Sequence, residues 1–245
     1  MEIAIYPVAA QADARIAGEL IELVARKPGA LLCIAAGHTS LGLFDALAAA
    51  CESGKTSLKD ARFVAMDEWA GMGAATPGGC GDFLTRHFLS RVDLAPGNVR
   101  LFDGRAADLA AECDGVEDFI ARSGGIDYLV LGVGMNGHIA LNEPKSSFSS
   151  RSRAVPLDDT TRRVGQKYFG DPVALVGGVT LGVATLCEAR RIAVTIYGAH
   201  KAEVAAAALR GPIDEAMPAS ALRRCEGALY ALDAAAASRL SDDAR

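Results

Sequence analysis

Short apolar runs alternate with helical patterns along most of this chain. Strands are expected at residues 2–6, 31–35, 62–66, 126–133, 190–197 and 227–232, and helices at 10–26, 41–51 and 200–209. The run over 126–133 is rich in β-branched residues, which suits a strand buried on both faces. This alternation predicts an α/β fold: an open, mostly parallel sheet, doubly wound in the Rossmann-like manner and flanked by helices on both faces.

No internal repeat divides the 245 residues, and no linker is rich enough in Pro, Gly or Ser to separate two domains. The sequence therefore predicts one domain over residues 1–245. A domain of that size buries about 70% of its unfolded surface. The last residues, Ala234–Arg245, are expected to form a short helix with a frayed end.

Composition narrows the class of protein. Hydrophobic residues make up 51% of the chain, and the net charge of -5 argues against general affinity for nucleic acid. The six cysteines show no zinc-like spacing, so most are expected to be reduced thiols. No apolar run approaches the ~20 residues that span a bilayer, and the N-terminus opens on a strand pattern without a signal peptide. These features predict a soluble cytoplasmic protein that does not bind membranes.

Ligands of an open parallel sheet bind beyond the carboxyl ends of its strands, so the loops that follow the strands carry the candidate chemistry. Residues 36–40 follow one strand, and their Gly-His-Thr-Ser sequence opens a helix. Free N–H groups, hydroxyls and a positive dipole end suit a phosphate there, although Thr39 or Ser40 could simply cap the helix.

Two adjacent carboxylates, Asp67 and Glu68, follow the strand at 62–66. Neighbouring residues at a strand end point in opposite directions, so only one should enter a site while the other faces a helix or solvent. One carboxylate could serve as a base. A capping carboxylate or a surface pair is the alternative.

The glycine-rich turn at 131–144 places His138 and Glu143 directly after a buried strand. Its glycines match the G-x-G-x-x-G dinucleotide fingerprint, but Pro144 and a polar run follow where a helix should begin. Asp158 lies near the spacing expected of the ribose-binding acid, yet no apolar strand precedes it. The turn is therefore interpreted as a site of proton transfer, with a structural histidine as the alternative.

Two further loops are basic. Residues 145–167 hold six Lys and Arg against Asp158 and Asp159, and an anionic small substrate or a solvated surface would explain them. Lys201 opens the helix after the strand at 190–197 and could complete a phosphate site. Together the four loops predict one phosphate site, one base and one His/Glu relay. No metal-ligand cluster accompanies them, which indicates proton transfer on a phosphorylated metabolite without a metal or cofactor.

These residues resemble the glucosamine-6-phosphate deaminase (isomerase) family over nearly the whole chain. The resemblance rests on Met66–Trp69, Gly134–Pro144, Ser146–Arg153, Thr180–Thr185, Gly198–Lys201 and Met217–Leu222. The related 6-phosphogluconolactonases share the fold and the Gly-His turn but lack the Asn-Glu-Pro sequence, so Glu143 favours the deaminase branch.

The resemblance implies conversion of an amino-sugar phosphate to a ketose phosphate and ammonia, without a cofactor. Asp67 resembles the base that moves a proton between C2 and C1 of the opened sugar. His138 resembles the acid/base that opens the pyranose ring, and Glu143 the carboxylate that orients it. Asn136 takes the third position of this relay, where many relatives have aspartate.

For the phosphate, Gly37, Thr39 and Lys201 match the family's cradle, and Ser40 lies beside them. Lys167 stands where an arginine is usual, which replaces a bidentate fork by a point charge. Three further positions depart from the family's pattern. Ala36 stands where a hydroxyl residue is common, and His38 replaces a glycine. The segment Gly78–Gly81 stands where a Ser-Tyr pair is common.

The sequence thus predicts an amino-sugar-phosphate deaminase acting on glucosamine 6-phosphate or a close epimer such as galactosamine 6-phosphate. The alternatives are a sugar-phosphate isomerase, a 6-phosphogluconolactonase-like hydrolase and a non-catalytic sugar-phosphate sensor. The expected partner is the small-molecule substrate, and the sequence is compatible with either a monomer or a homo-oligomer.

Overall fold

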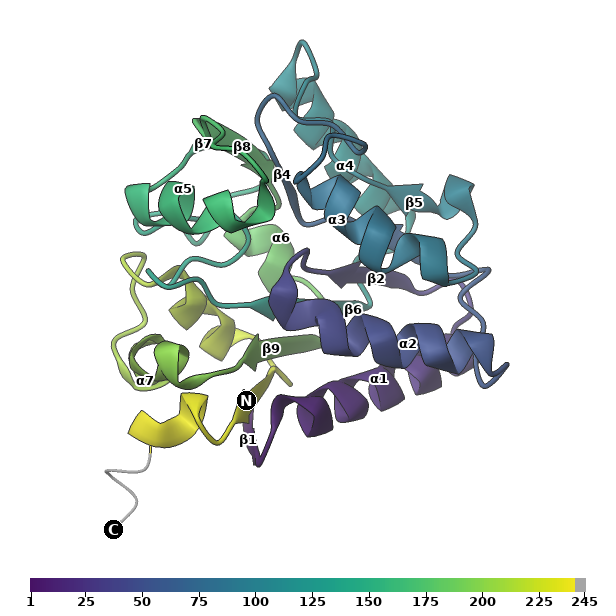
Figure 1. Cartoon of the computed structure of the whole chain (residues 1–245), viewed down its shortest axis with the longest axis horizontal. Coiled ribbons are helices and arrows are strands. Elements are labelled where there is room, and N and C mark those ends of the chain that lie inside the picture. The colour runs from purple at the N-terminus through teal and green to yellow at the C-terminus, as the bar shows by residue number, and fades with distance from the viewer. Residues whose placement is uncertain (241–245) are drawn as a thin grey trace.

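The computed structural model describes residues 1–240, and a seven-stranded sheet forms its centre (Figure 1). All neighbouring strands in this sheet run parallel. In spatial order they are β1 (Glu2–Tyr6), β10 (Leu229–Asp233), β9 (Ile192–Ile196), β6 (Tyr128–Gly132), β2 (Leu31–Ile34), β3 (Arg62–Val64) and β5 (Val99–Arg100).

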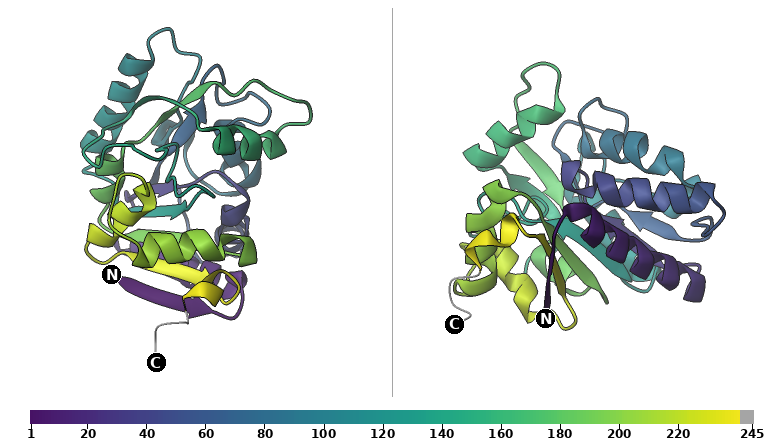
Figure 2. Two further views of the ribbon diagram at one scale, coloured as in Figure 1. Left: turned by 90° about the vertical axis from the view of Figure 1, so that its left-hand side faces the viewer. Right: turned by 60° about the horizontal axis from the view of Figure 1, so that its bottom comes forward.

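The apolar composition of the central strands follows from their position between two layers of helices. Every residue of β2 and β9 is buried, as are the first four of β6 and β10. Right-handed crossovers place α1 and α2 on one face and α7 on the other (Figure 2). The longer helices are α1 (Ala9–Arg26), α2 (Leu41–Glu52), α3 (Cys80–His87), α4 (Leu109–Arg122) and α7 (Ala202–Arg210).

The strand order reverses direction at the middle of the sheet. The chain builds outwards from β2 through β3 to β5, and then returns to β6 and continues through β9 to β10. The crevice beyond the carboxyl ends of β2 and β6 is therefore the expected ligand site of such a sheet.

A second sheet of three antiparallel strands lies beside this crevice, and the sequence patterns did not predict it. It consists of β4 (Asp67–Trp69), β8 (Gly177–Thr180) and β7 (Arg153–Pro156), in that order. In the chain, the helix α5 (Asp159–Gly165) follows β7 and the helix α6 (Val183–Cys187) follows β8. The strand predicted at 62–66 ends at Val64, and the chain enters the small sheet three residues later.

The six predicted strands and the three predicted helices are confirmed, with small shifts at their ends. The strand β7 ends two residues before Asp158, but it starts with an arginine and is not the apolar strand that a dinucleotide site requires. This strand is half exposed and antiparallel, so it still does not form the βαβ unit of a dinucleotide site. At the C-terminus, the predicted helix is a short 3₁₀ turn over Ala236–Arg239, and its last five residues lie outside the described part.

Two further expectations concern the cysteines and membrane-spanning helices. All six cysteines are free thiols, as predicted, and Cys33 is buried in β2. Cys187 is only half-buried, at the end of α6. Within residues 1–240 no helix is both long and apolar enough to cross a membrane.

Candidate active site

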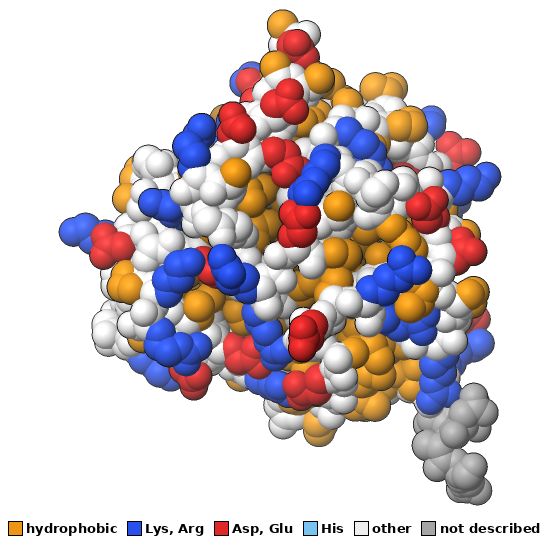
Figure 3. All heavy atoms as spheres, turned by 180° about the vertical axis from the view of Figure 1, so that it is seen from behind, with side chains coloured by type: hydrophobic (Ala, Val, Ile, Leu, Met, Phe, Trp, Pro, Cys, Tyr) orange, Lys and Arg blue, Asp and Glu red, His pale blue; other side chains and the backbone are white. Residues whose placement is uncertain are grey.

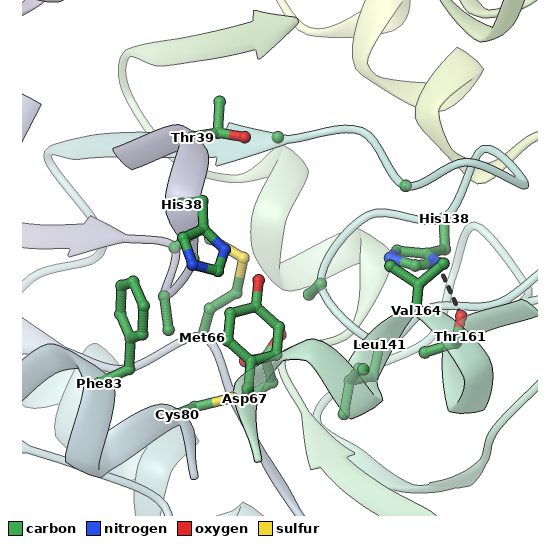
Figure 4. Close-up of a pocket in the computed structure, with 18 of the residues that line it drawn as sticks. His38, Thr39, Met66, Asp67, Cys80, Phe83, His138, Leu141, Thr161 and Val164 are labelled. Carbon is green, nitrogen blue, oxygen red and sulfur yellow. Dashed lines mark hydrogen bonds between the residues drawn. The ribbon is translucent and has the colours of Figure 1, made fainter. Parts of the chain in front are cut away.

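A pocket opens at the carboxyl ends of β2, β3, β6 and β9, with the small sheet and α5 forming its far wall (Figure 4). Loops that are distant in the sequence meet there, as the topology requires. Eight of the ten predicted site residues line it: Gly37, His38, Thr39, Ser40, Asp67, His138, Lys167 and Lys201. The other two, Asn136 and Glu143, lie behind His138 and contact it or each other.

The turn that follows β2 presents the N-terminal end of α2 to the pocket. It forms a short 3₁₀ helix, His38–Ser40, that runs directly into α2. The buried Ser40 hydroxyl donates to the Ala35 carbonyl at 2.7 Å, so it stabilises the turn. The exposed Thr39 hydroxyl stays free to face a ligand, and neither side chain caps the helix. Hydroxyl, N–H groups and helix dipole together favour an anion.

Two lysines converge on the same end of the pocket. Lys201 donates from Nζ to the Val133 carbonyl at 2.5 Å, which holds its ammonium beside the carboxyl end of β6. Burial, and then the nearby charge of Lys167, lower the pKa of Lys201 to about 8. Burial also lowers the pKa of Lys167. Because the two ammonium groups disfavour each other's charge, a bound anion would stabilise both.

His38 belongs to an aromatic cluster on the pocket wall. Its ring stacks on Tyr168 at a centroid distance of 5.2 Å and meets the edge of Phe83 at 5.8 Å. Burial, followed by the charges of Lys167 and His87, lowers the pKa of His38. The lowered pKa favours the neutral imidazole, so His38 contributes packing more than charge beside the two lysines of the anion site.

The two adjacent carboxylates separate as predicted. Asp67 faces the pocket at the start of β4, while the buried Glu68 points to the N-terminus of α3. Burial raises the pKa of Asp67 to about 6, and the Cys80 thiol and His138 act in the opposite direction. Glu68 accepts hydrogen bonds from the backbone N–H groups of Trp69, Cys80 and Gly81 at 2.8–2.9 Å.

The unusual Gly78–Gly81 segment follows from this arrangement. A Cβ on Gly79 would lie 3.1 Å from both carboxylate oxygens of Glu68, and one on Gly81 would lie 2.7 Å from the Ala74 Cα. The glycines let the α3 N-terminus approach Glu68 closely, which brings Cys80 next to Asp67 (Figure 4).

His138 stands across the pocket from Asp67 and is held by polar neighbours. Its Nδ1 lies 3.5 Å from Glu143 Oε2 and 3.1 Å from the Thr161 hydroxyl (Figure 4). Gly134 leaves room for its ring, since a Cβ there would lie 2.3 Å from the imidazole. Gly134, which matched a dinucleotide fingerprint, therefore makes space for His138. A dinucleotide site would have a helix directly after this turn, but the next helix in the chain is α5.

Glu143 is stabilised as a carboxylate behind this histidine. Burial alone would raise the pKa of Glu143, but hydrogen bonds from His138, Thr161 and Asn136 outweigh it and lower that pKa. Asn136 donates from Nδ2 to Glu143 at 2.8 Å, and its Oδ1 accepts a hydrogen bond from the backbone N–H of His138 at 3.3 Å. An amide at position 136 thus orders the relay without placing a second negative charge beside Glu143.

Thr161 is the residue of this site that sequence reasoning missed. It is buried on α5 and reaches the relay from 23 positions downstream of His138. It follows another threonine and precedes two arginines in the sequence, so no local pattern marks it. Only the fold, which turns α5 back over the pocket, brings it to His138.

The basic loop after the glycine-rich turn contributes less than expected. Lys167 is the member that lines the pocket. Arg151 pairs with Glu188, Arg153 donates to Asn142, and Arg162 donates to the Leu157 carbonyl. Half of the loop's six basic side chains therefore stabilise the protein's own structure.

The sequence matches a family model described as glucosamine-6-phosphate isomerases/6-phosphogluconolactonase over residues 6–231. A glucosamine-6-phosphate deaminase of Beutenbergia cavernae is 40% identical over 242 residues, which cover 98% of this chain and 93% of the relative. Another, of Streptomyces coelicolor, is 37% identical with the same coverage of both chains.

Solved structures agree with these matches. The structure of a monomeric glucosamine-6-phosphate deaminase matches with a TM-score of 0.94 at 31% identity. The match covers 98% of this chain and 100% of the deaminase chain. The 6-phosphogluconolactonase of Trypanosoma brucei has a TM-score of 0.78 at 21% identity and covers 98% of each chain, which shows the shared fold alone.

Proposed function

Because this chain belongs to the family of glucosamine-6-phosphate isomerases and 6-phosphogluconolactonases, we propose that it is a glucosamine-6-phosphate deaminase. The observation that carries the proposal is the pocket itself. A carboxylate, Asp67, faces a histidine–carboxylate relay, His138 with Glu143, and an anion site lies at the end of the same cavity. Proton transfer on a phosphorylated sugar needs these three components together.

The anion site holds the substrate by its phosphate. The turn at Gly37 and Thr39 offers N–H and hydroxyl donors, and Lys201 and Lys167 supply positive charge. Anchoring one end of the sugar leaves its reacting carbons to be aligned with Asp67 and His138. Such alignment lowers the barrier by removing the entropy cost of bringing the groups together.

His138 opens the pyranose ring by moving the proton of the anomeric hydroxyl to the ring oxygen, and Glu143 stabilises the charge that the imidazole gains. Asp67 then takes the proton from C2 and returns it to C1. The amine on C2 becomes an imine, and water displaces it as ammonia, which leaves a ketose 6-phosphate. Hydrogen only moves within the substrate, so no redox cofactor is consumed.

The electrostatics of the pocket support these roles. A general base works best when its pKa is close to the working pH, and burial raises the pKa of Asp67 to about 6. Glu143 shows the opposite behaviour, because its hydrogen bonds keep it ionised beside His138.

The test is to incubate the purified protein with glucosamine 6-phosphate and, separately, with galactosamine 6-phosphate. Ammonia and ketose phosphate are measured in both. The proposal predicts equal amounts of the two products from at least one sugar. Absence of ammonia from both sugars would overturn it.

The alternatives give different products in the same assays. Ketose formation without ammonia would identify a sugar-phosphate isomerase, and hydrolysis of 6-phosphogluconolactone would identify a lactonase. A sugar-phosphate sensor would bind tightly without turnover. Glu143 favours the deaminase, because it provides the relay with a carboxylate 3.5 Å from His138.

We further propose that residues 1–245 act as one domain in the cytoplasm, with the amino-sugar phosphate as the partner. The sequence is compatible with a monomer or a homo-oligomer, and sedimentation analysis of the purified protein would decide between them.

A further inference from the structure

The two proton-transfer groups of the pocket lie on different sheets. Asp67 begins β4 in the small antiparallel sheet, whereas His138 and Glu143 belong to the turn that leaves β6 in the large parallel sheet. Neither sheet alone fixes the spacing between them. Besides the short link from Val64 at the end of β3 to Asp67, contacts between the small sheet and the turn must set it, since proton transfer at two neighbouring atoms of one sugar requires both groups in register.

Thr180, the last residue of β8, contacts both the strand that carries Asp67 and the turn that carries His138 and Glu143. In the small sheet it is paired with Asp67. Its hydroxyl accepts a hydrogen bond from the Leu141 N–H, at 3.1 Å, inside the His138–Glu143 turn. Thr180 is fully buried, so water does not compete for this bond.

The next residue repeats the connection. The Leu181 N–H donates to the Met66 carbonyl at 2.9 Å, directly before Asp67. The Leu181 carbonyl accepts from Asn142 Nδ2 at 2.8 Å, directly before Glu143. Two successive residues at the end of β8 therefore each hold the base on one side and the relay turn on the other.

The relay turn depends on these contacts for its shape. Ala140 has a φ of +51°, a left-handed conformation that costs an alanine roughly 1 kcal/mol. The turn closes through a bridge between Ile139 and Asn142, and the buried Asn142 also donates to the Ile139 carbonyl at 3.0 Å. Surrounding hydrogen bonds must hold such a turn in place, and the end of β8 provides them.

We propose that Thr180 and Asn142 are positioning residues that set the spacing between Asp67 and the His138–Glu143 relay. Neither side chain lines the pocket, so they act through the groups they hold. The inference rests on the proposed function, because it assigns Asp67 and His138 to successive steps of one reaction.

Thr180→Val tests the inference most simply. Valine keeps the shape of threonine but cannot accept the Leu141 N–H, so the relay turn should shift relative to Asp67. We expect kcat to fall roughly ten- to a hundredfold, because a displacement of a catalytic group by about 1 Å has an effect of that order. KM should stay within about twofold, since Gly37, Thr39 and Lys201 of the anion site lie on the loops after β2 and β9, which this bond does not touch.

Two companion variants separate positioning from general stability. Thr180→Ser keeps the hydroxyl and should restore most of the wild-type kcat. Thr195→Val removes another buried threonine hydroxyl, which donates to the Leu131 carbonyl within the large sheet, and should leave kcat within about twofold. If Thr180→Val matches Thr195→Val in kcat, or if serine fails to rescue, the inference is wrong.

Asn142→Asp provides a second route if Thr180→Val does not fold. Aspartate can still pair with Arg153 but cannot donate to the Ile139 and Leu181 carbonyls. It should lower kcat with little change in KM, and an unchanged kcat would overturn the inference. All variants are compared with wild-type ammonia release, so an inactive wild type would contradict the proposed function and not the positioning roles.

Discussion

Asp67 is the residue whose ionisation should limit the enzyme in acid. Burial raises the pKa of its carboxyl to about 6, and only the deprotonated form can accept the C2 proton. The rate should therefore be constant well above pH 6 and fall about tenfold per pH unit below it. A kcat/KM profile of glucosamine 6-phosphate between pH 4.5 and 8 measures this limb, and a rate that keeps rising toward pH 5 would contradict the assignment.

Lys201 should limit the enzyme in alkali. Its pKa is lowered to about 8, so the free enzyme loses this ammonium as the pH rises through that value. Binding of the phosphate should then weaken, with KM rising above pH 8. Lys201→Gln should raise KM roughly ten- to a hundredfold at pH 7, because a charged hydrogen bond contributes about 1.5–3 kcal/mol. The exposed Lys55→Gln is the matched control, and an equal KM in both variants would remove Lys201 from the phosphate site.

Thr161 should affect the rate without affecting binding. Thr161→Val keeps the side chain's shape but removes the hydroxyl that contacts His138 Nδ1 and Glu143. We expect kcat to fall about tenfold, the effect of roughly 1.4 kcal/mol, with KM nearly unchanged. Thr161→Ser should recover most of the loss. Steady-state kinetics of the two variants decides the point, and equal activity in valine and serine would show that the hydroxyl plays no part.

At the scale of elements, Glu68 connects β4 to α3. Its buried carboxylate accepts hydrogen bonds from two backbone N–H groups at the α3 N-terminus, those of Cys80 and Gly81, and from the Trp69 N–H within β4. Burial raises its pKa to about 7, so between about pH 4.5 and 7 the folded protein binds more protons there than the unfolded chain does. The contribution of Glu68 to stability is therefore full in acid and is lost as the pH rises through 7.

Glu68→Gln should remove this part of the pH dependence. The free energy of unfolding of the wild type should decrease from pH 5 to pH 8. For the variant this decrease should be smaller by roughly 1–3 kcal/mol, since one pKa unit corresponds to about 1.4 kcal/mol. Urea unfolding at several pH values measures both slopes. The exposed Glu22→Gln should keep the wild-type slope. Parallel curves for the wild type and Glu68→Gln would contradict the assignment.

Sequence patterns located six of the seven strands of the large sheet and missed the three short strands of the small sheet. The strand at 126–133 was recognisable because a parallel strand between two helical layers is almost wholly apolar. By contrast, β8 is four residues long with two glycines, and β7 starts with an arginine and is half exposed. Short antiparallel strands of this kind owe their pairing to tertiary contacts, which a local pattern does not contain.

The same distinction applies to the site. Asp67 and His138 lie directly after predicted strands, so the topology of a parallel sheet was enough to bring them together. Thr161 and Thr180 lie on the segment between β6 and β9, whose path the sequence left undetermined. Their roles depend on hydrogen bonds of 3.1 Å to residues more than 20 positions away.

Over the whole molecule, the parallel sheet supplies the anion site and the relay, while the small sheet supplies the base. The face seen from behind the view of Figure 1 carries interspersed acidic and basic side chains between apolar patches (Figure 3). Mixed charge of that kind is typical of an ordinary protein surface. The chemistry of this protein is therefore concentrated where the two sheets meet.

The measurement that tests this account most directly is ammonia release from glucosamine 6-phosphate by the wild type and by Asp67→Asn, together with calorimetric binding of the same sugar phosphate. We predict ammonia and ketose phosphate in equal amounts from the wild type. Asp67→Asn should bind with similar affinity and release ammonia at least about a hundredfold more slowly, as expected for loss of a general base. Ammonia release by Asp67→Asn at the wild-type rate, or none from the wild type, would contradict the account.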